Sequence, residues 1–166
     1  MEERIKASVI TLSTRAAKKE REDTSGPALC ALILDEGWEV ASYEVLPDDE
    51  DLLAERLLRT CDDLSPHLLF TLGGTGLSPT DVTPEATGRV VEREVPGIAE
   101  TVRSKSIEKT DRAMLSRARS GVRGTTLIVN FPGSERAVRE SFEVVRRTLP
   151  HAVETMLGKV KDCGRE

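Results

Sequence analysis

The chain is organised around the stretch Thr71-Leu72-Gly73-Gly74-Thr75-Gly76-Leu77-Ser78-Pro79-Thr80-Asp81-Val82-Thr83-Pro84-Glu85-Ala86-Thr87. The apolar residues 67–72 that lead into it predict a buried strand. At its far end Thr83 is expected to cap a helix, with Pro84 at the first helical position and Glu85 near the positive end of the helix dipole. The stretch therefore predicts a strand, a glycine-rich loop and a helix in direct succession.

The glycines of this loop predict a phosphate-binding site. Gly73, Gly74 and Gly76 allow the backbone to approach a ligand closely and to turn its N–H groups toward it. The N-terminus of the following helix favours anions, phosphate above all. A side chain at Gly74 is therefore expected to obstruct the phosphate. The loop lacks the lysine of a Walker A loop, and it does not match the G-x-G-x-x-G dinucleotide pattern.

Asp81 distinguishes this loop, because it places a carboxylate five residues after the last glycine. A carboxylate beside a phosphate site repels the ligand unless a cation bridges them, and Mg²⁺ is the usual bridge. The alternative interpretation is a turn or capping carboxylate ahead of Thr83. The residues alone leave both interpretations open.

Composition limits the class of protein. A length of 166 residues fits a single domain. The net charge of −5, with no basic block, argues against nucleic acid as a partner. Charged residues interrupt every apolar run, which argues against a membrane span or a signal peptide, and we expect a cytoplasmic protein.

The cysteines do not predict a disulfide framework or a zinc site, because they are three in number and widely spaced. Cys30 and Cys61 lie among leucines and are expected to be buried thiols, whereas Cys163 lies in a polar tail. His67 and His151 have no visible partners in the sequence and are expected to be structural.

Strands and helices are expected to alternate along the chain. Apolar or alternating patterns predict strands in residues 4–13, 38–46, 67–72 and 125–131. Four helices are predicted before residue 107: one that starts in residues 23–27 and ends at 37, one that starts in 47–51, one over 84–93 and one over 98–106. A fifth begins at Ser134 and has Val138, Phe142, Val145 and Leu149 on one face, and a sixth lies between Pro150 and Gly158. Residues 13–22 are predicted to form a loop and 121–124 a short strand or turn; 108–119 follow no clear pattern.

This alternation predicts an α/β protein with a mostly parallel sheet and helices on both faces. Ligands of such sheets bind outside the carboxyl ends of the strands. Four segments lie at those predicted ends, namely residues 13–15, 47–48, 73–81 and 132–134. The sequence therefore predicts one site at this edge, although Asp48 also fits the N-cap of the helix that follows it.

The same segments carry a resemblance to a known family. The chain resembles the molybdopterin adenylyltransferases, the MogA/MoaB-like proteins of molybdenum cofactor synthesis, from about residue 5 to 158. The strongest matches are Gly73-Gly74-Thr75-Gly76 and Asp81-Val82-Thr83-Pro84-Glu85-Ala86. Supporting matches are Asp23-Thr24-Ser25-Gly26-Pro27-Ala28-Leu29, Pro47-Asp48, Leu115-Ser116-Arg117, Gly121-Val122-Arg123-Gly124 and Asn130-Phe131-Pro132-Gly133-Ser134.

The resemblance implies a three-layer α/β/α domain spanning residues 1–166, assembled as a homotrimer or hexamer. It implies molybdopterin and ATP as substrates, Mg²⁺ as cofactor, and Asp48 and Asp81 as the functional, metal-holding aspartates. It also suggests a molybdenum insertase as a partner. Substrate or nucleotide contacts are then expected at Ser13, Arg15, Gly73, Gly74, Thr75, Gly76, Ser78, Thr80, Ser116, Arg117, Pro132, Gly133 and Ser134, and Arg123 is a further candidate for phosphate contact.

Two positions depart from the family pattern. Thr14 replaces an acidic residue that often follows the first strand's serine, and Thr80 replaces an arginine that often precedes the loop aspartate. Adenylylation of molybdopterin, with release of pyrophosphate, is the first hypothesis. The departures motivate a second, a paralogue that binds molybdopterin without turnover. Hydrolysis of a nucleotide pyrophosphate, as in competence-damage-type relatives, is the third.

Overall fold

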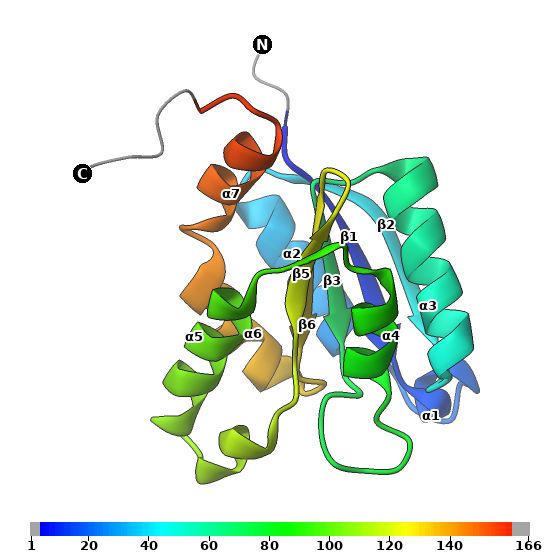
Figure 1. Ribbon diagram of the computed structural model, residues 1–166. Helices are drawn as coiled ribbons and strands as arrows, with labels where there is room; N and C mark the ends of the chain where they lie inside the picture. The colour runs from blue at the N-terminus through cyan, green and yellow to red at the C-terminus, as the bar shows by residue number, and fades with distance from the viewer. Residues whose placement is uncertain (1–3, 161–166) are drawn as a thin grey trace.

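The computed structural model describes residues 4–160, and Cys163 lies outside them. Strands and helices alternate as expected (Figure 1). The strands are β1 (Lys6–Leu12), β2 (Glu39–Leu46), β3 (Leu68–Leu72), β4 (Arg93–Glu94), β5 (Ser120–Arg123) and β6 (Thr126–Phe131). The helical elements are α1 (Thr14–Ala17), α2 (Ser25–Asp35), α3 (Glu50–Arg59), η1 (Thr60–Leu64), α4 (Thr83–Val90), α5 (Pro96–Ile107), η2 (Asp111–Leu115), α6 (Glu135–Val145) and α7 (Leu149–Met156).

The six strands form one sheet in the order β2-β1-β3-β6-β5-β4. The first four are parallel, and β5 and β4 extend the sheet antiparallel. The parallel strands end in register, because Leu12 pairs with Leu46 and Leu72 pairs with Phe131. The segments that follow these strands therefore emerge together at one edge of the sheet, seen at the bottom of Figure 1.

Helices cover both faces of the sheet, which confirms the three-layer α/β/α arrangement. Alternate strand residues point to opposite faces. Phe70 packs with α2, α5, α6 and α7 on one face, where Phe142 is the largest buried helix side chain. Its neighbour Leu69 packs with α3 and α4 on the other face, against Leu53 and Leu57.

Several local predictions were wrong. Residues 14–17 are helical rather than loop, because the Ser13 hydroxyl accepts a hydrogen bond from Ala16 N and caps α1. The helix predicted over 84–93 ends at Val90, since Arg93 and Glu94 pair with β5 instead. Helix α5 begins at Pro96, two residues early, because proline is well tolerated in the first turn.

Thr83 does not cap α4. Its hydroxyl is buried and donates to Gly73 O at 2.8 Å, and the capping position is occupied by Val82, which makes no side-chain cap. Helix α6 is capped by Ser134 as predicted, but it ends at Val145, so Leu149 begins α7 rather than continuing the apolar face of α6.

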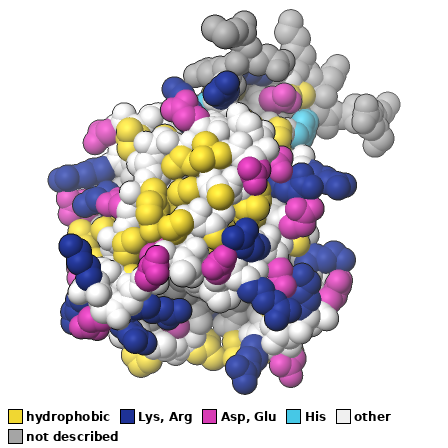
Figure 2. All heavy atoms as spheres, turned by 180° about the vertical axis from the view of Figure 1, so that it is seen from behind, with side chains coloured by type: hydrophobic (Ala, Val, Ile, Leu, Met, Phe, Trp, Pro, Cys, Tyr) yellow, Lys and Arg dark blue, Asp and Glu magenta, His cyan; other side chains and the backbone are white. Residues whose placement is uncertain are grey.

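Two surface features complete the fold. On the side that Figure 1 hides, apolar side chains gather in a patch with charged side chains around it (Figure 2). Within residues 4–160, no helix is both long enough and apolar enough to cross a membrane.

The two cysteines of the described residues differ in burial. Cys61 is buried as expected, whereas Cys30 is partly exposed.

Candidate functional site

A cleft of about 690 Å³ opens at the carboxyl edge of the parallel strands. It brings together the four segments that were predicted to meet there. Its lining includes Ser13, Thr14, Arg15, Asp48, Gly73, Gly74, Thr75, Gly76, Thr80, Asp81, Gly133 and Ser134. Most of the predicted contact residues therefore share one cavity, although they come from four different loops.

The glycine loop brings unpaired backbone donors to the lining of this cleft. Gly73 and Gly74 both have positive φ, 97° and 68°, a conformation that glycine adopts without steric cost. Among the described residues, the N–H groups of Gly74, Thr75 and Gly76 have no hydrogen-bond partner. Three successive donors in a polar cleft are suited to an anion such as phosphate.

Gly73 and Gly74 are required by packing as well as by conformation. A Cβ at Gly73 would lie 2.7 Å from Leu12 O, and a Cβ at Gly74 would lie 2.3 Å from the Thr83 hydroxyl oxygen. The Cβ direction at Gly74 is therefore toward α4. This corrects the expectation that a side chain there would obstruct the phosphate directly.

Asp48 is held by Thr14, the first residue of α1, rather than by the N-terminus of α3. Asp48 Oδ2 accepts from Thr14 N at 3.0 Å and from Thr14 Oγ1 at 2.9 Å. Asp48 N donates in turn to Thr14 Oγ1 at 3.0 Å. The N-cap of α3 is the next residue, Asp49, which accepts from Leu52 N at 2.8 Å. The capping interpretation of Asp48 is thus wrong.

Asp81 closes a turn within the glycine-rich loop. Its Oδ2 atom accepts from Ser78 N at 3.0 Å, and its own N–H donates to Ser78 O at 2.9 Å. The carboxylate also lies close to Gly76, where an added Cβ would be 2.8 Å from Oδ2. The turn role that was one interpretation of Asp81 therefore coexists with a position on the cleft.

Asp48 and Asp81 both line the cleft with carboxylate oxygens, the ligand type that Mg²⁺ prefers. Asp48 and Asp81 each use Oδ2 internally, and within residues 4–160 neither Oδ1 makes a hydrogen bond. Carboxylate oxygens are what Mg²⁺ takes from proteins, usually only one or two, with the remainder from water and substrate phosphate. The described residues hold no cluster of three or more metal-ligating side chains, so this protein alone would not enclose the ion.

The N-termini of α2 and α6 both border the cleft, and their caps differ. At α2, Asp23 Oδ1 accepts from Ser25 N at 3.1 Å and from Gly26 N at 3.2 Å, so a carboxylate already compensates the positive end. Burial, together with the hydrogen bond to Asp23, raises the pKa of Tyr43. At α6 the side-chain cap is the neutral Ser134 hydroxyl, and the acidic Glu135 of the first turn is paired with Arg139.

The remaining predicted residues lie elsewhere. Ser116 and Pro132 line a second, mostly apolar pocket of about 280 Å³, which shares Thr75 and Gly76 with the cleft. Ser78 is exposed on the loop. Arg123 lies at the opposite edge of the sheet, where its Nε and Nη2 atoms donate to Asp62, each at 2.9 Å, so the phosphate role considered for it is wrong.

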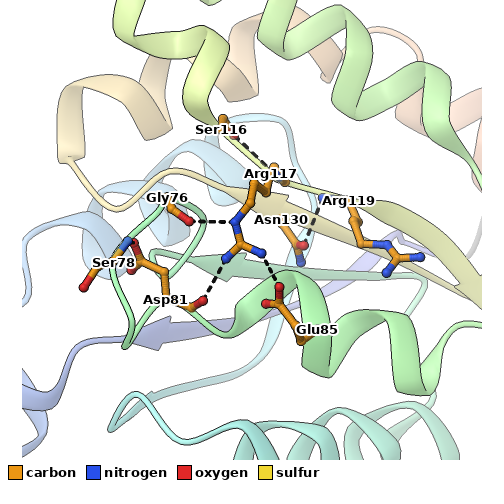
Figure 3. Close-up of polar contacts among 9 residues, drawn as sticks. Gly76, Ser78, Asp81, Glu85, Ser116, Arg117, Arg119 and Asn130 are labelled. Atoms are coloured by element: carbon orange, nitrogen blue, oxygen red, sulfur yellow. Dashed lines mark hydrogen bonds and ion pairs between the residues drawn. The ribbon is translucent and has the colours of Figure 1, made fainter.

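Arg117 is directed at the protein rather than at the cleft (Figure 3). Its side chain donates to Gly76 O, to Asp81 O and to Glu85. Burial alone would raise the pKa of Glu85, but the hydrogen bond and the charge of Arg117 outweigh it and lower that pKa below its usual range. These contacts favour a structural role for Arg117 over the predicted phosphate contact.

Four further residues line the cleft that the sequence did not predict there, namely Arg21, Asp23, Thr24 and Ser25. Ser25 Oγ donates to Gly133 O at 2.5 Å and so joins α2 to the loop after β6. A signal was available, because these residues lie between β1 and the first turn of α2.

Comparisons with known proteins agree on one family. The model described as "Probable molybdopterin binding domain" matches residues 8–151. The molybdopterin adenylyltransferase of Helicobacter pylori strain J99 is 36% identical over 152 residues, covering 90% of this chain and 86% of that protein. The Drosophila melanogaster molybdenum cofactor synthesis protein cinnamon is 41% identical over 155 residues, which are 91% of this chain but only 25% of that protein.

Solved structures agree as well. The molybdopterin biosynthesis enzyme MoaB of Thermus thermophilus has a TM-score of 0.88 and 42% identity, covering 95% of this chain and 99% of that one. The protein CinA of Thermoplasma acidophilum shares the fold, with a TM-score of 0.67, at only 15% identity.

Proposed function

The chain belongs to the family of probable molybdopterin-binding domains, and on that premise we propose that it is a molybdopterin adenylyltransferase that uses Mg-ATP. The observation that carries the proposal is the single cleft in which the glycine loop, Asp48 and Asp81 meet. Relatives that the match covers over 86% and 74% of their length bear the name molybdopterin adenylyltransferase, which supports the same activity.

The proposed reaction joins two phosphates. An oxygen of the terminal phosphate of molybdopterin attacks the α-phosphorus of ATP, the bond from that phosphorus to the α–β bridging oxygen breaks, and pyrophosphate leaves. Such chemistry depends mainly on positioning and on neutralising charge. No protein nucleophile is required.

The residues of the cleft would divide this work. The N–H groups of Gly74, Thr75 and Gly76 would hold phosphate oxygens, and the N-terminus of α6 at Ser134 would hold a second group of negative charge. Asp48 and Asp81 would hold Mg²⁺ through their Oδ1 atoms. Bound there, Mg²⁺ supplies positive charge that neutralises the polyphosphate.

The second pocket suits the pterin end of the substrate. Its mostly apolar lining includes Val102, Leu115 and Pro132, which would pack against a flat ring, and it meets the cleft at Thr75 and Gly76. Ser116 and Glu140 offer polar atoms at the same pocket for the edge of the ring. The two cavities would then place the pterin on one side of the glycine loop and the nucleotide on the other.

The test is product analysis after incubation with ATP, Mg²⁺ and molybdopterin. We expect adenylylated molybdopterin and pyrophosphate in equal amounts. Tight binding of molybdopterin without turnover would replace the proposal with the non-catalytic paralogue, which the Thr14 and Thr80 departures first suggested. Release of nucleotide hydrolysis products without molybdopterin would replace it with a pyrophosphatase.

The proposal includes a recipient for the product. Cinnamon and the gephyrin of Dictyostelium discoideum match this chain over only 25% and 23% of their lengths, so each contains much additional sequence. We expect the adenylylated product to pass to a molybdenum insertase.

A further inference from the structure

One guanidinium group connects three parts of the glycine-rich loop and the helix after it. Arg117 Nε donates to Gly76 O at 2.7 Å and Nη2 donates to Asp81 O at 2.8 Å, while Nη1 pairs with Glu85 in the first turn of α4 (Figure 3). The Arg117 backbone N–H donates to Thr75 O at 2.8 Å. Arg117 thus contacts both ends of the segment between Gly76 and Asp81.

Residues 77–80 of that segment make no contact with the rest of the protein as extensive as those of Arg117 at its two ends. All four residues 77–80 are exposed, and Leu77 is 64% exposed. Inside the segment the hydrogen bonds are local, chiefly those between Ser78 and Asp81. Thr83, two residues after Asp81, is hydrogen-bonded to Gly73 and Gly74. Arg117 adds the contact from outside the loop that reaches Gly76 and Asp81 themselves.

We propose that Arg117 is a positioning residue, which holds the Asp81 carboxylate against the glycine loop so that metal and phosphate meet in one place. The inference rests on the proposed function in that Asp81 is taken to hold Mg²⁺. Arg117 itself does not touch the substrate. Its role is exerted through the carbonyl groups at the two ends of the segment.

The chemistry of arginine suits this role. A guanidinium offers five N–H donors in a rigid plane, so three acceptors that lie in different directions can be satisfied at once. A lysine ammonium carries the charge but has no such fork. Glu85 supplies the opposite charge within the cluster, and this pairing competes with any contact between Arg117 and a phosphate.

The segment that carries Arg117 is itself anchored to the main body. Arg103 in α5 donates through Nη1 to Ser116 O at 2.8 Å, which fixes the residue immediately before Arg117. Ser116 also lines the second pocket. The backbone around Arg117 is therefore fixed by two contacts, one from Arg103 to Ser116 and one from Arg117 N to Thr75 O.

The first test is calorimetric titration of Mg²⁺ and ATP into the full chain and its Arg117→Ala and Arg117→Lys variants. The Mg²⁺ concentration at half-saturation of Mg-dependent ATP binding should rise about 10- to 100-fold in Arg117→Ala, as for loss of groups that orient metal ligands. The half-saturating Mg²⁺ concentration of Arg117→Lys should lie between those of the unmodified chain and Arg117→Ala. Excess Mg²⁺ should restore ATP binding in both variants. ATP binding without Mg²⁺ should be unchanged.

Arg119→Ala is the matched control. Arg119 lies two residues along, has a similar exposure and pairs with Glu94, and its side chain does not reach the loop. This variant should bind Mg²⁺ and ATP as the unmodified chain does. A loss of Mg-free ATP binding in the Arg117 variants would overturn the inference and show a direct phosphate contact, and unchanged Mg²⁺ dependence would overturn it as well.

The second test needs no ligand, so it can be applied to a variant that binds neither Mg²⁺ nor ATP. Amide hydrogen exchange of the segment 77–82 in the free protein should be faster in Arg117→Ala than in the unmodified chain, and unchanged in Arg119→Ala. Equal exchange in both variants would overturn the positioning role. If the unmodified chain binds no Mg-ATP at all, the proposed function fails, and hydrogen exchange still decides whether Arg117 holds the loop.

Discussion

The adjacent residues Asp48 and Asp49 have different roles, one at the cleft and one as a helix cap, which the sequence alone could not assign. Asp48 accepts hydrogen bonds from Thr14 and faces the cleft, whereas Asp49 caps α3. Asparagine caps a helix about as well as aspartate. It lacks the full negative charge that a Mg²⁺ site requires. Substitution by asparagine therefore tests metal binding at one position and leaves capping intact at the other.

Asp48→Asn and Asp81→Asn should each lower turnover by about 10²-fold or more, equivalent to roughly 3 kcal/mol of transition-state stabilisation. We expect the larger loss at Asp81, which shares its loop with the phosphate-binding glycines. Turnover is measured at saturating Mg²⁺ and ATP. Asp49→Asn is the control and should keep full turnover, and full activity in both cleft variants would refute their assignment.

Thr14 is more than a neutral replacement for the family's acidic residue. Its hydroxyl both donates to Asp48 Oδ2 and accepts from Asp48 N. Thr14→Val keeps the shape but removes both hydrogen bonds, and we expect turnover to fall about 10-fold, the lower range for residues that orient metal ligands. Thr14→Ser keeps the hydroxyl and should stay close to the unmodified chain. Equal activity of the two variants would contradict this role.

At the scale of the elements, the glycine loop is packed directly onto α4. Thr83 donates from its hydroxyl to Gly73 O and from its N–H to Gly74 O. A Cβ at Gly74 would displace that hydroxyl. Gly124 offers a comparison, since it also has positive φ, 55°, but its Cβ would meet nothing within 4 Å.

Gly74→Ala should therefore destabilise the protein more than Gly124→Ala. Both variants carry the cost of a left-handed conformation, roughly 1–2 kcal/mol. Gly74→Ala also loses the Thr83 hydrogen bond and leaves a buried acceptor unsatisfied, which adds about 1–3 kcal/mol. Chemical denaturation of the two variants measures the difference. Equal losses of unfolding free energy would mean that the loop can move away from α4.

The strands and their common edge could be predicted because each depends on local patterns of apolar residues and turns. The partners of Arg117 could not, since Gly76 and Asp81 lie 41 and 36 residues away from it in the chain. Thr83 was misassigned for the same reason: its sequence fits a cap, and only the packed loop shows that its hydroxyl turns back to Gly73. Edge pairing likewise made Arg93 and Glu94 a strand instead of a helix end.

At the scale of the whole molecule, the expected homotrimer is a prediction drawn from the family resemblance. The apolar side chains gathered on one side of the chain give a surface that association could bury (Figure 2). Light scattering of the purified protein at micromolar concentration should give three times the mass of one chain, or a multiple of that. The mass of a single chain would refute the prediction.

The buried thiol of Cys61 makes the free energy of unfolding depend on pH. Burial raises the pKa of Cys61 to about 11 from its ordinary 9.0, so the folded state holds the thiol proton more tightly than the unfolded state does. The stability from this group is fully present below pH 9 and is lost as the pH rises toward 11.

Other groups also titrate in this range, so the measurement must be a difference. The excess unfolding free energy of the protein over its Cys61→Ala variant should be constant below pH 9 and should shrink between pH 9 and 11, because alanine has no proton to lose. Denaturant unfolding at a series of pH values gives both curves. A difference that stays constant to pH 11 would show that the folded state does not raise the pKa of Cys61.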